Sequence, residues 1–295
     1  MRIKSPAKIN LRLEVLGRRP DGYHEIRTLF QLVDLCDEII LEQAPRGVSI
    51  STSAAGVPRD GTNLCVAAAR RLERFTRGRQ GVRIFLKKRI PVAAGLGGAS
   101  SNAASTLLGL NRLWNLRLPR KVLNEEARAI GADVPFFVSG CGSAWGLARG
   151  DRIVPADLRA PFWALIVTPS VPVRTDMIYS YIGSMGPFLT SPVLGARMPR
   201  KILQPLSDII QLLHNDLQKV TVVLKPVVGR LIHCLRSIGV QSVCMSGSGP
   251  SVFALFTSKE EAVRTRDRLR SQLGSQGAGP ARFFVAKALG SSFCR

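Results

Sequence analysis

The chain has 295 residues and an ordinary apolar content of 45%, which excludes a disordered protein and, at roughly 150 residues per domain, predicts two domains. Its net charge of +22 makes polyanions natural partners. Nucleic acid, nucleotides and phosphorylated metabolites all fit this charge, and so does a solvated surface with no specific partner. The six cysteines form no C-x-x-C pair, which argues against a zinc or thioredoxin-like motif.

The amino end has no secretory h-region, and no run of about 18 apolar residues predicts a membrane span. We therefore expect a reduced, cytoplasmic protein with free thiols. Nucleic-acid binding is not favoured as the main function, because the sequence contains no compact basic arm or aromatic-interleaved basic patch.

The first predicted element is a strand over residues 5–15, where polar and apolar residues alternate. This strand places Lys8 and Asn10 on one face. The alternative for Lys8 is a solvated strand face, since lysines are mostly exposed. A Pro-Asp-Gly turn follows. Tyr23 and His24 come directly after this turn. Their two flat rings either bind a planar base or cover the edge of a hydrophobic core.

The chain then alternates between strands and helices up to its first glycine-rich loop. We predict strands over residues 26–32, 37–52 and 82–87, a loop over 56–61 and a helix over 63–75.

The glycine-rich loop over residues 91–104 joins the strand at 82–87 to a helix. Three glycines in four positions allow the backbone to approach a bulky anion closely. Ser100 and Ser101 are predicted at the N-cap, and a helix N-terminus suits phosphate. The loop is neither a Walker A loop nor G-x-G-x-x-G, so a tight turn with no ligand is the alternative.

Asp133 is a lone acid in an apolar setting, just after a helix predicted over residues 119–130 with Gly131 as its C-cap. Its simplest role is to cap a short helix that begins near Pro135. A catalytic role is compatible with that position. Residues 143–154 return to a strand pattern.

The second half of the chain is predicted to follow a domain change near residues 156–161 and to form a split β-α-β sandwich. Its predicted elements are strands at 163–167, 240–245, 252–256 and 283–288, helices at 202–217, 226–239 and 258–273, the last with a capping box at Ser258, a weakly helical loop at 178–200, and a small-residue loop at 246–251.

Taken in this order, the landmarks resemble the GHMP small-molecule kinases. Residues 91–104 match the family's phosphate loop, P-x-x-x-G-L-G-[GS]-x-S-[SA], and residues 246–251 match its C-terminal glycine motif. Residues 5–11, 19–24 and 131–135 resemble the branch that phosphorylates a cytidyl-diphospho-methylerythritol in non-mevalonate isoprenoid (terpenoid) biosynthesis. The likeness covers nearly the whole chain and is thinnest over 176–206.

The resemblance implies an α+β, two-domain GHMP kinase fold, with an S5-like N-terminal domain over residues 1–157 and a ferredoxin-like C-terminal domain over 158–295. The implied activity moves the γ-phosphoryl group of ATP to the 2-hydroxyl of 4-(cytidine 5'-diphospho)-2-C-methyl-D-erythritol. Mg²⁺ would bridge phosphate oxygens, with Ser101 or waters nearby, and the sequence identifies no carboxylate ligand. No membrane or nucleic-acid partner is implied, and the protein would be a monomer or a homodimer.

The resemblance also assigns roles to residues. Asp133 would accept the proton of the attacking hydroxyl, and Lys8 beside it would keep it ionised. The residues implied to bind ATP are Pro91, Val92, Ala93, Ala94, Gly95, Leu96, Gly97, Gly98, Ala99, Ser100 and Ser101, with Asn63 and Lys88 as further contacts. The residues implied to bind substrate are Asn10, Tyr23, His24, which would stack on cytosine, and Thr175, which would touch the diphosphate.

Two features depart from the family's pattern. Ala99 stands where the loop often has glycine, and its methyl group fits if the residue keeps a negative φ. The net charge of +22 exceeds what a small-molecule kinase requires.

Overall fold

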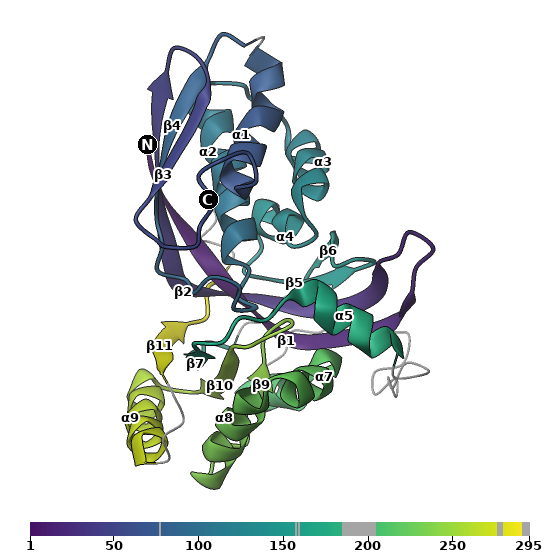
Figure 1. The fold of residues 1–295 in the computed structure, drawn as a ribbon, viewed down its shortest axis with the longest axis vertical. Coiled ribbons are helices and arrows are strands. Elements are labelled where there is room, and N and C mark those ends of the chain that lie inside the picture. Colours follow the sequence, from purple (N-terminus) through teal and green to yellow (C-terminus); the bar gives the residue numbers. More distant parts are fainter. Residues whose placement is uncertain (77, 157, 159, 185–204, 276–279, 291–295) are drawn as a thin grey trace.

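The computed structural model describes the whole chain except residues 77, 157, 159, 185–204, 276–279 and 291–295. It contains two sheets, each covered by helices, and confirms the α+β fold (Figure 1). The larger sheet lies in the upper part of the view and the smaller one in the lower part. The division at residue 157 stays a prediction.

The larger sheet has seven strands in the order β3-β4-β2-β1-β8, with β5 paired to β2 and β6 paired to β5. Its strands are β1 (Arg2–Arg18), β2 (His24–Ala44), β3 (Val48–Thr52), β4 (Gly81–Lys87), β5 (Ser143–Leu147), β6 (Arg152–Pro155) and β8 (His214–Asn215).

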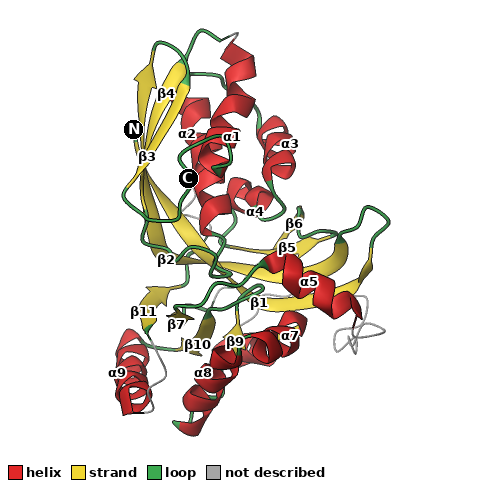
Figure 2. Ribbon diagram, viewed as in Figure 1, coloured by secondary structure: helices red, strands yellow, loops and turns green. Residues whose placement is uncertain are grey.

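The long antiparallel pair of β1 and β2 is the central element of the larger sheet and extends down to the level of α5 (Thr175–Ser184) (Figure 2). β2 pairs with β5 along its first half and with β4 along its second half. This single strand of 21 residues therefore pairs with two neighbours besides β1. Irregularities in the β1–β2 register follow Pro6, Asn10 and Val15. Lys8 and Asn10 lie in the middle of β1, between two of these irregularities.

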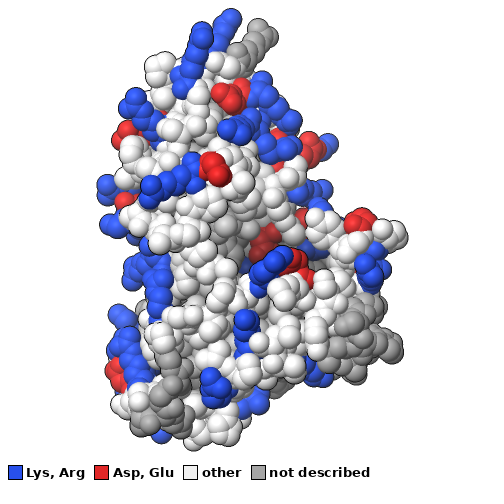
Figure 3. Space-filling model, viewed as in Figure 1, with Lys and Arg blue, Asp and Glu red and all other residues white. Residues whose placement is uncertain are grey.

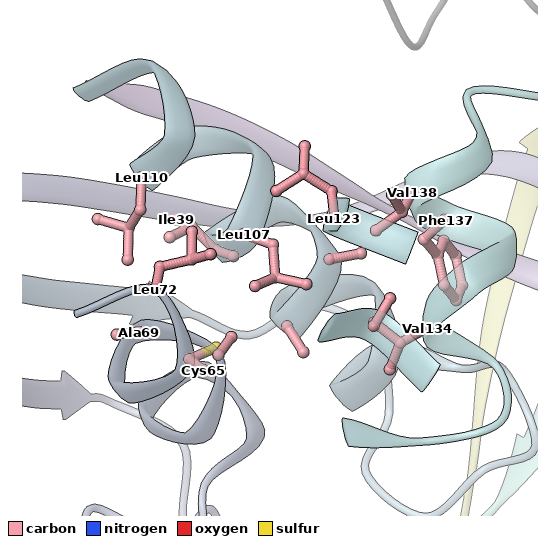
Figure 4. Close-up of a cluster of buried hydrophobic side chains, with 14 of the residues drawn as sticks. Ile39, Cys65, Ala69, Leu72, Leu107, Leu110, Leu123, Val134, Phe137 and Val138 are labelled. Atoms are coloured by element: carbon pink, nitrogen blue, oxygen red, sulfur yellow. The ribbon is translucent and has the colours of Figure 1, made fainter. Parts of the chain in front are cut away.

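Helices cover one face of the larger sheet. They are α1 (Leu64–Glu73), α2 (Gly98–Leu113), α3 (Arg120–Ile130) and α4 (Val134–Ser139), with a 3-10 turn at Arg74–Thr76 after α1. Figure 4 shows the core between them, where Leu107 and Leu110 of α2 meet Leu72 of α1 and Leu123 of α3. Each such side chain contributes about 1.5–3 kcal/mol when fully buried. This core fixes the position at which α2 begins.

The smaller sheet has the order β11-β7-β10-β9 with antiparallel pairs, which is the predicted split β-α-β arrangement. Its strands are β7 (Trp163–Pro169), β9 (Val243–Met245), β10 (Val252–Phe256) and β11 (Ala281–Lys287), and its helices are α8 (Pro226–Ser237) and α9 (Lys259–Ser275). The backbone N–H of Glu261 donates to Ser258 Oγ at 3.2 Å, which confirms Ser258 as the cap of α9.

Several predicted boundaries were wrong. The strand predicted over 37–52 is the end of β2 plus β3, and the strand predicted over 143–154 is the hairpin of β5 and β6. The helix predicted over 202–217 is α6 (Leu206–Gln211), then β8, then α7 (Asp216–Leu224). The break occurs because the Asn215 side chain caps α7 by accepting from the Leu217 N–H at 2.9 Å.

The loop predicted over 178–200 begins as a helix, because α5 continues to Ser184. The rest of that loop lies outside the described residues. Among the residues that the structure describes, no helix has both the length and the apolar character that a membrane span requires. On the face in Figure 3, Lys and Arg are scattered over the whole height of the molecule, with fewer Asp and Glu among them.

Candidate active site

A cavity of about 1010 Å³ lies where the two glycine-rich loops and the middle of β1 meet. Its wall is formed by residues 91–100 of the first loop, by Gly247 and Ser248 of the second, and by side chains from β1, β2 and α5. All the predicted site residues except Ser101 line this cavity. Segments that are far apart in the sequence therefore share one site.

The first loop is a helix start shaped by left-handed glycines. Gly95 has φ +74° and Gly97 has φ +67°, and Gly97 is the N-cap of α2. The prediction of the N-cap at Ser100 or Ser101 was wrong, because the helix begins at Gly98 and its N-cap lies three residues before Ser100. Gly98, Ala99 and Ser100 form the first turn of α2, where backbone N–H groups lack intrahelical acceptors. This end of the helix faces the cavity and suits an anion.

Ala99 and Ser101 occupy different environments at the start of α2. Ala99 lies inside α2 and keeps ordinary helical backbone, so its methyl group is accommodated as expected. Ser101 is wholly buried, and its Oγ lies 2.8 Å from Ser5 Oγ on β1. Its hydroxyl therefore ties α2 to β1 and faces away from the cavity.

The two glycine-rich loops hold each other. Ser246 Oγ donates to the carbonyl oxygen of Gly95 at 2.9 Å. The N–H of Lys8 donates to the carbonyl oxygen of Leu96 at 3.0 Å. A Cβ on Gly95 would lie 2.1 Å from the carbonyl oxygen of Ser246, so only glycine permits this approach. The first loop is thereby fixed to both β1 and the second loop.

Lys8 and Asp133 form an ion pair at the cavity. Lys8 Nζ lies 3.3 Å from Asp133 Oδ2 and donates to Asn10 Oδ1 at 2.5 Å. The Lys8 side chain is 4% exposed and that of Asp133 is 32% exposed, which excludes the solvated alternative for Lys8. Burying this ammonium requires the nearby carboxylate. The carboxylate itself remains accessible from the cavity.

Asp133 occupies the N-cap position of α4, but its side chain makes no capping hydrogen bond. The simpler reading of this residue as a helix cap is therefore not supported by its contacts. Asn10 also has protein partners, because its Nδ2 donates to Thr28 Oγ1 at 2.8 Å while its Oδ1 accepts from Lys8. Asn10 orients the Lys8 ammonium toward Asp133.

Comparison with known proteins agrees with this geometry. The model of the GHMP kinases N terminal domain matches residues 63–141, and that of the GHMP kinases C terminal domain matches residues 200–275. A 4-diphosphocytidyl-2-C-methyl-D-erythritol kinase of Geobacter sulfurreducens is 40% identical over 272 residues, which cover 92% of this chain and 95% of that protein. The chain belongs to the 4-diphosphocytidyl-2-C-methyl-D-erythritol kinase family.

Other relatives support the same assignment. The enzyme of that name from Geobacter metallireducens is 42% identical over 88% of this chain and 90% of its own length. A crystal structure of a 4-(cytidine 5'-diphospho)-2C-methyl-D-erythritol kinase superposes with a TM-score of 0.76 at 32% identity, covering 98% of this chain and all of the other. A mevalonate kinase of L. major shares the fold, with a TM-score of 0.72 at 16% identity, covering 99% of this chain and 96% of its own.

Members of the 4-diphosphocytidyl-2-C-methyl-D-erythritol kinase family are small-molecule kinases, so ATP is the phosphate donor. Two predicted ATP contacts, Lys88 and Asn63, lie on the cavity wall with protein partners of their own. Lys88 Nζ donates to Asp37 and, at 3.1 Å, to Asn102 Oδ1. Asn63 Oδ1 caps α1 by accepting from the N–H of Cys65 at 2.9 Å.

Asp37 is a residue of this kinase that sequence reasoning missed. Its side chain is wholly buried and accepts hydrogen bonds from Lys88 and Asn102 and from the backbone N–H groups of Arg89 and Ile90, the last two at 2.7 and 2.9 Å. Four donors stabilise its charge inside the protein. Asp37 thereby holds Lys88 beside Gly98, where the phosphate loop becomes a helix.

Another part of the cavity wall carries rings and hydroxyls. The rings of His24 and of Tyr179 on α5 lie next to each other, with centroids 5.1 Å apart and planes tilted by 31°. Thr175 Oγ1 lies 2.8 Å from Ser248 Oγ, so α5 is tied to the second glycine loop. Burial and the nearby charge of Arg18 hold the pKa of His24 below its ordinary value of 6.5, so its ring is neutral at pH 7. Tyr179 is a further cavity residue that the sequence did not single out, and Ser248 belongs to the predicted second glycine loop.

Proposed function

We propose that this chain transfers the γ-phosphoryl group of ATP to the 2-hydroxyl of 4-(cytidine 5'-diphospho)-2-C-methyl-D-erythritol, giving the 2-phosphate and ADP in non-mevalonate isoprenoid biosynthesis. The names of the relatives support this substrate. The observation that carries the chemistry is the ion pair of Asp133 and Lys8, which opens into the same cavity as the glycine-rich start of α2.

Phosphoryl transfer requires positioning and charge neutralisation more than covalent participation by the protein. In this proposal the backbone N–H groups at Gly98, Ala99 and Ser100 hold the ATP phosphates. Asp133 accepts the proton of the attacking hydroxyl. Lys8 lies beside the Asp133 carboxylate and neutralises charge at the reacting centre, while Asn10 fixes the direction of the Lys8 ammonium.

Mg²⁺ would neutralise the phosphate oxygens when bound with ATP. Among the described residues no cluster of three or more His, Cys, Asp or Glu side chains is suited to a metal ion. Mg²⁺ requires no such cluster, since it usually keeps several waters and takes one or two carboxylates beside the substrate's phosphates. Asp133 and Asp176 are the carboxylates of the cavity wall that would hold it, together with waters, because the buried Ser101 hydroxyl is directed at Ser5.

The cytidyl end of the substrate is assigned to Tyr23 and His24, and its diphosphate to Thr175. Tyr23 is 54% exposed and lies on the cavity wall, and the His24 ring lies beside that of Tyr179. Mevalonate and homoserine carry no base for such rings. This end of the cavity therefore favours the cytidyl substrate over the acceptors of the other kinases that share the fold.

The test is ADP release from Mg·ATP with three acceptors: the cytidyl-diphospho compound, mevalonate and homoserine. We expect turnover with the first alone. Turnover with mevalonate or homoserine instead would overturn the substrate assignment. A basic nucleic-acid-binding module would show tight, salt-sensitive duplex binding without ADP release. The predictions of a cytoplasmic location and of a monomer or homodimer remain open to cell fractionation and light scattering.

Replacing His24 with alanine is expected to raise the KM for the cytidyl substrate roughly 5- to 150-fold, because stacking on a base is worth about 1–3 kcal/mol. The KM for ATP should stay unchanged, since His24 is assigned to the cytidyl substrate and not to the phosphate loop. Steady-state kinetics with each substrate varied in turn measure both constants. Equal loss for both substrates would indicate a folding defect, which a thermal melt detects.

A further inference from the structure

The turn between β5 and β6 lies against the start of β2. The N–H of Ile26 donates to the carbonyl oxygen of Ala148 at 2.7 Å. Ala148 has φ +61°, a left-handed conformation that is uncommon for a residue other than glycine. Such a conformation persists where the surroundings over-determine it. The neighbouring Arg149 is therefore presented from a firmly held turn.

Arg149 lies over the ring of Tyr23. The guanidinium carbon is 4.9 Å from the ring centroid, within the range of a cation–π contact. One Arg149 amine donates to Asp151 Oδ2 at 2.8 Å, which fixes the guanidinium from the side. Arg149 and Tyr23 both line the cavity.

The main chain of Tyr23 is fixed separately by the Pro-Asp-Gly turn. Its N–H donates to Asp21 Oδ1 at 3.2 Å, and its carbonyl oxygen accepts from the N–H of Arg19 at 2.8 Å. These bonds position the backbone and leave the ring to rotate about its side-chain torsions. The contact with Arg149 restricts that rotation. A planar ring has two faces, so a guanidinium on one leaves the other for a planar ligand.

We propose that Arg149 is a positioning residue for the cytidyl end of the substrate, holding the Tyr23 ring so that its second face receives the base. The inference rests on the proposed function for the identity of the base. Holding an exposed ring in its bound orientation before the ligand arrives reduces the entropy lost on binding. No sequence pattern indicates this role, because Arg149 is 126 positions after Tyr23 and belongs to no motif.

Arg149→Met is expected to weaken binding of CDP, used as the probe, about 3- to 10-fold by isothermal titration calorimetry. The KM for the cytidyl substrate should rise to a similar extent, with kcat and the KM for ATP unchanged. Arg152→Met is the matched control, because Arg152 is an exposed cation on the same hairpin. Equal CDP affinity in the two variants would overturn the inference.

A double-mutant cycle with Tyr23→Leu tests whether Arg149 acts through the ring. We expect Arg149→Met to have no further effect once Leu occupies position 23. Additive losses would overturn the positioning role, since they would mean that Arg149 meets the ligand directly or acts through Asp151. Arg149→Lys keeps a cation that can lie over the Tyr23 ring, so it should recover part of the CDP affinity lost in Arg149→Met, and no recovery would overturn the role of the cation–π contact.

These outcomes separate the inference from the proposed function. If the wild type phosphorylates the cytidyl compound but Arg149 and Tyr23 show no coupling, the inference fails alone. If coupling is present in CDP binding but the wild type releases no ADP, the proposed function fails alone. A wild type that binds no CDP overturns the inference whatever its kinase activity.

Discussion

Asp133→Asn is expected to lower kcat by about 10²–10⁴-fold, the range over which a positioned general base contributes to a rate. The carboxylate is the accessible member of the pair with Lys8, 32% exposed against 4% for the lysine. An amide of the same shape cannot accept the proton of the attacking hydroxyl. The KM for the cytidyl substrate should change little, because the contacts assigned to the rings remain. ADP release under single-turnover and steady-state conditions measures both.

The isosteric change also separates catalysis from stability. Asp133 makes no capping hydrogen bond at the start of α4, so asparagine removes no helix cap. It does leave the Lys8 ammonium with a neutral partner in a buried position, which lowers the melting temperature. Asp267→Asn, on the exposed surface of α9, is the control for loss of one negative charge. A rate within about two-fold of the wild type would show that Asp133 is not the general base.

The sequence predicted those parts of the site that depend on local pattern. The glycine spacing of residues 91–101 predicted a strand, a turn and a helix start, and the structure confirms all three. The alternation along β1 placed Lys8 and Asn10 on one face, and their hydrogen bond confirms it. Both results rest on steric rules that act within a few residues.

The remaining features depend on contacts between distant segments, which no local pattern encodes. In the sequence, Asp37 is one acidic residue of a predicted strand and no pattern marks it. In the fold, the segment that follows β4 and the helix α2 bring four hydrogen-bond donors to its carboxylate. Ser101 appears equivalent to Ser100 in the sequence, yet the packing of α2 against β1 turns its hydroxyl inward to Ser5. The segment at His214–Asn215 has a helical pattern, but it pairs with Arg12 and Leu13 of β1 as a parallel strand.

Gly95→Ala is expected to reduce kcat/KM for ATP by at least about 10²-fold, since a misplacement of about 1 Å can cost that much in rate. The new Cβ would lie 2.1 Å from the carbonyl oxygen of Ser246, a distance that real Cβ atoms do not reach. The two glycine-rich loops must therefore separate, which also breaks the hydrogen bond from Ser246 Oγ to the Gly95 carbonyl. The turn that leads into Gly97 then loses the support that aims the start of α2 at the cavity.

Gly47→Ala is the matched control for the backbone cost of this change. Gly47 has φ +79°, close to the +74° of Gly95, but a Cβ there meets nothing within 4 Å. Both variants bear the cost of a left-handed alanine, about 1–2 kcal/mol, and both should melt at a lower temperature. Gly95→Ala alone should also lose activity, and its loss should be greater for ATP than for the cytidyl substrate. If the two variants retain the same kcat/KM, the contact between the loops does not position the phosphates. Glycine is then required at position 95 only for the left-handed backbone of the turn.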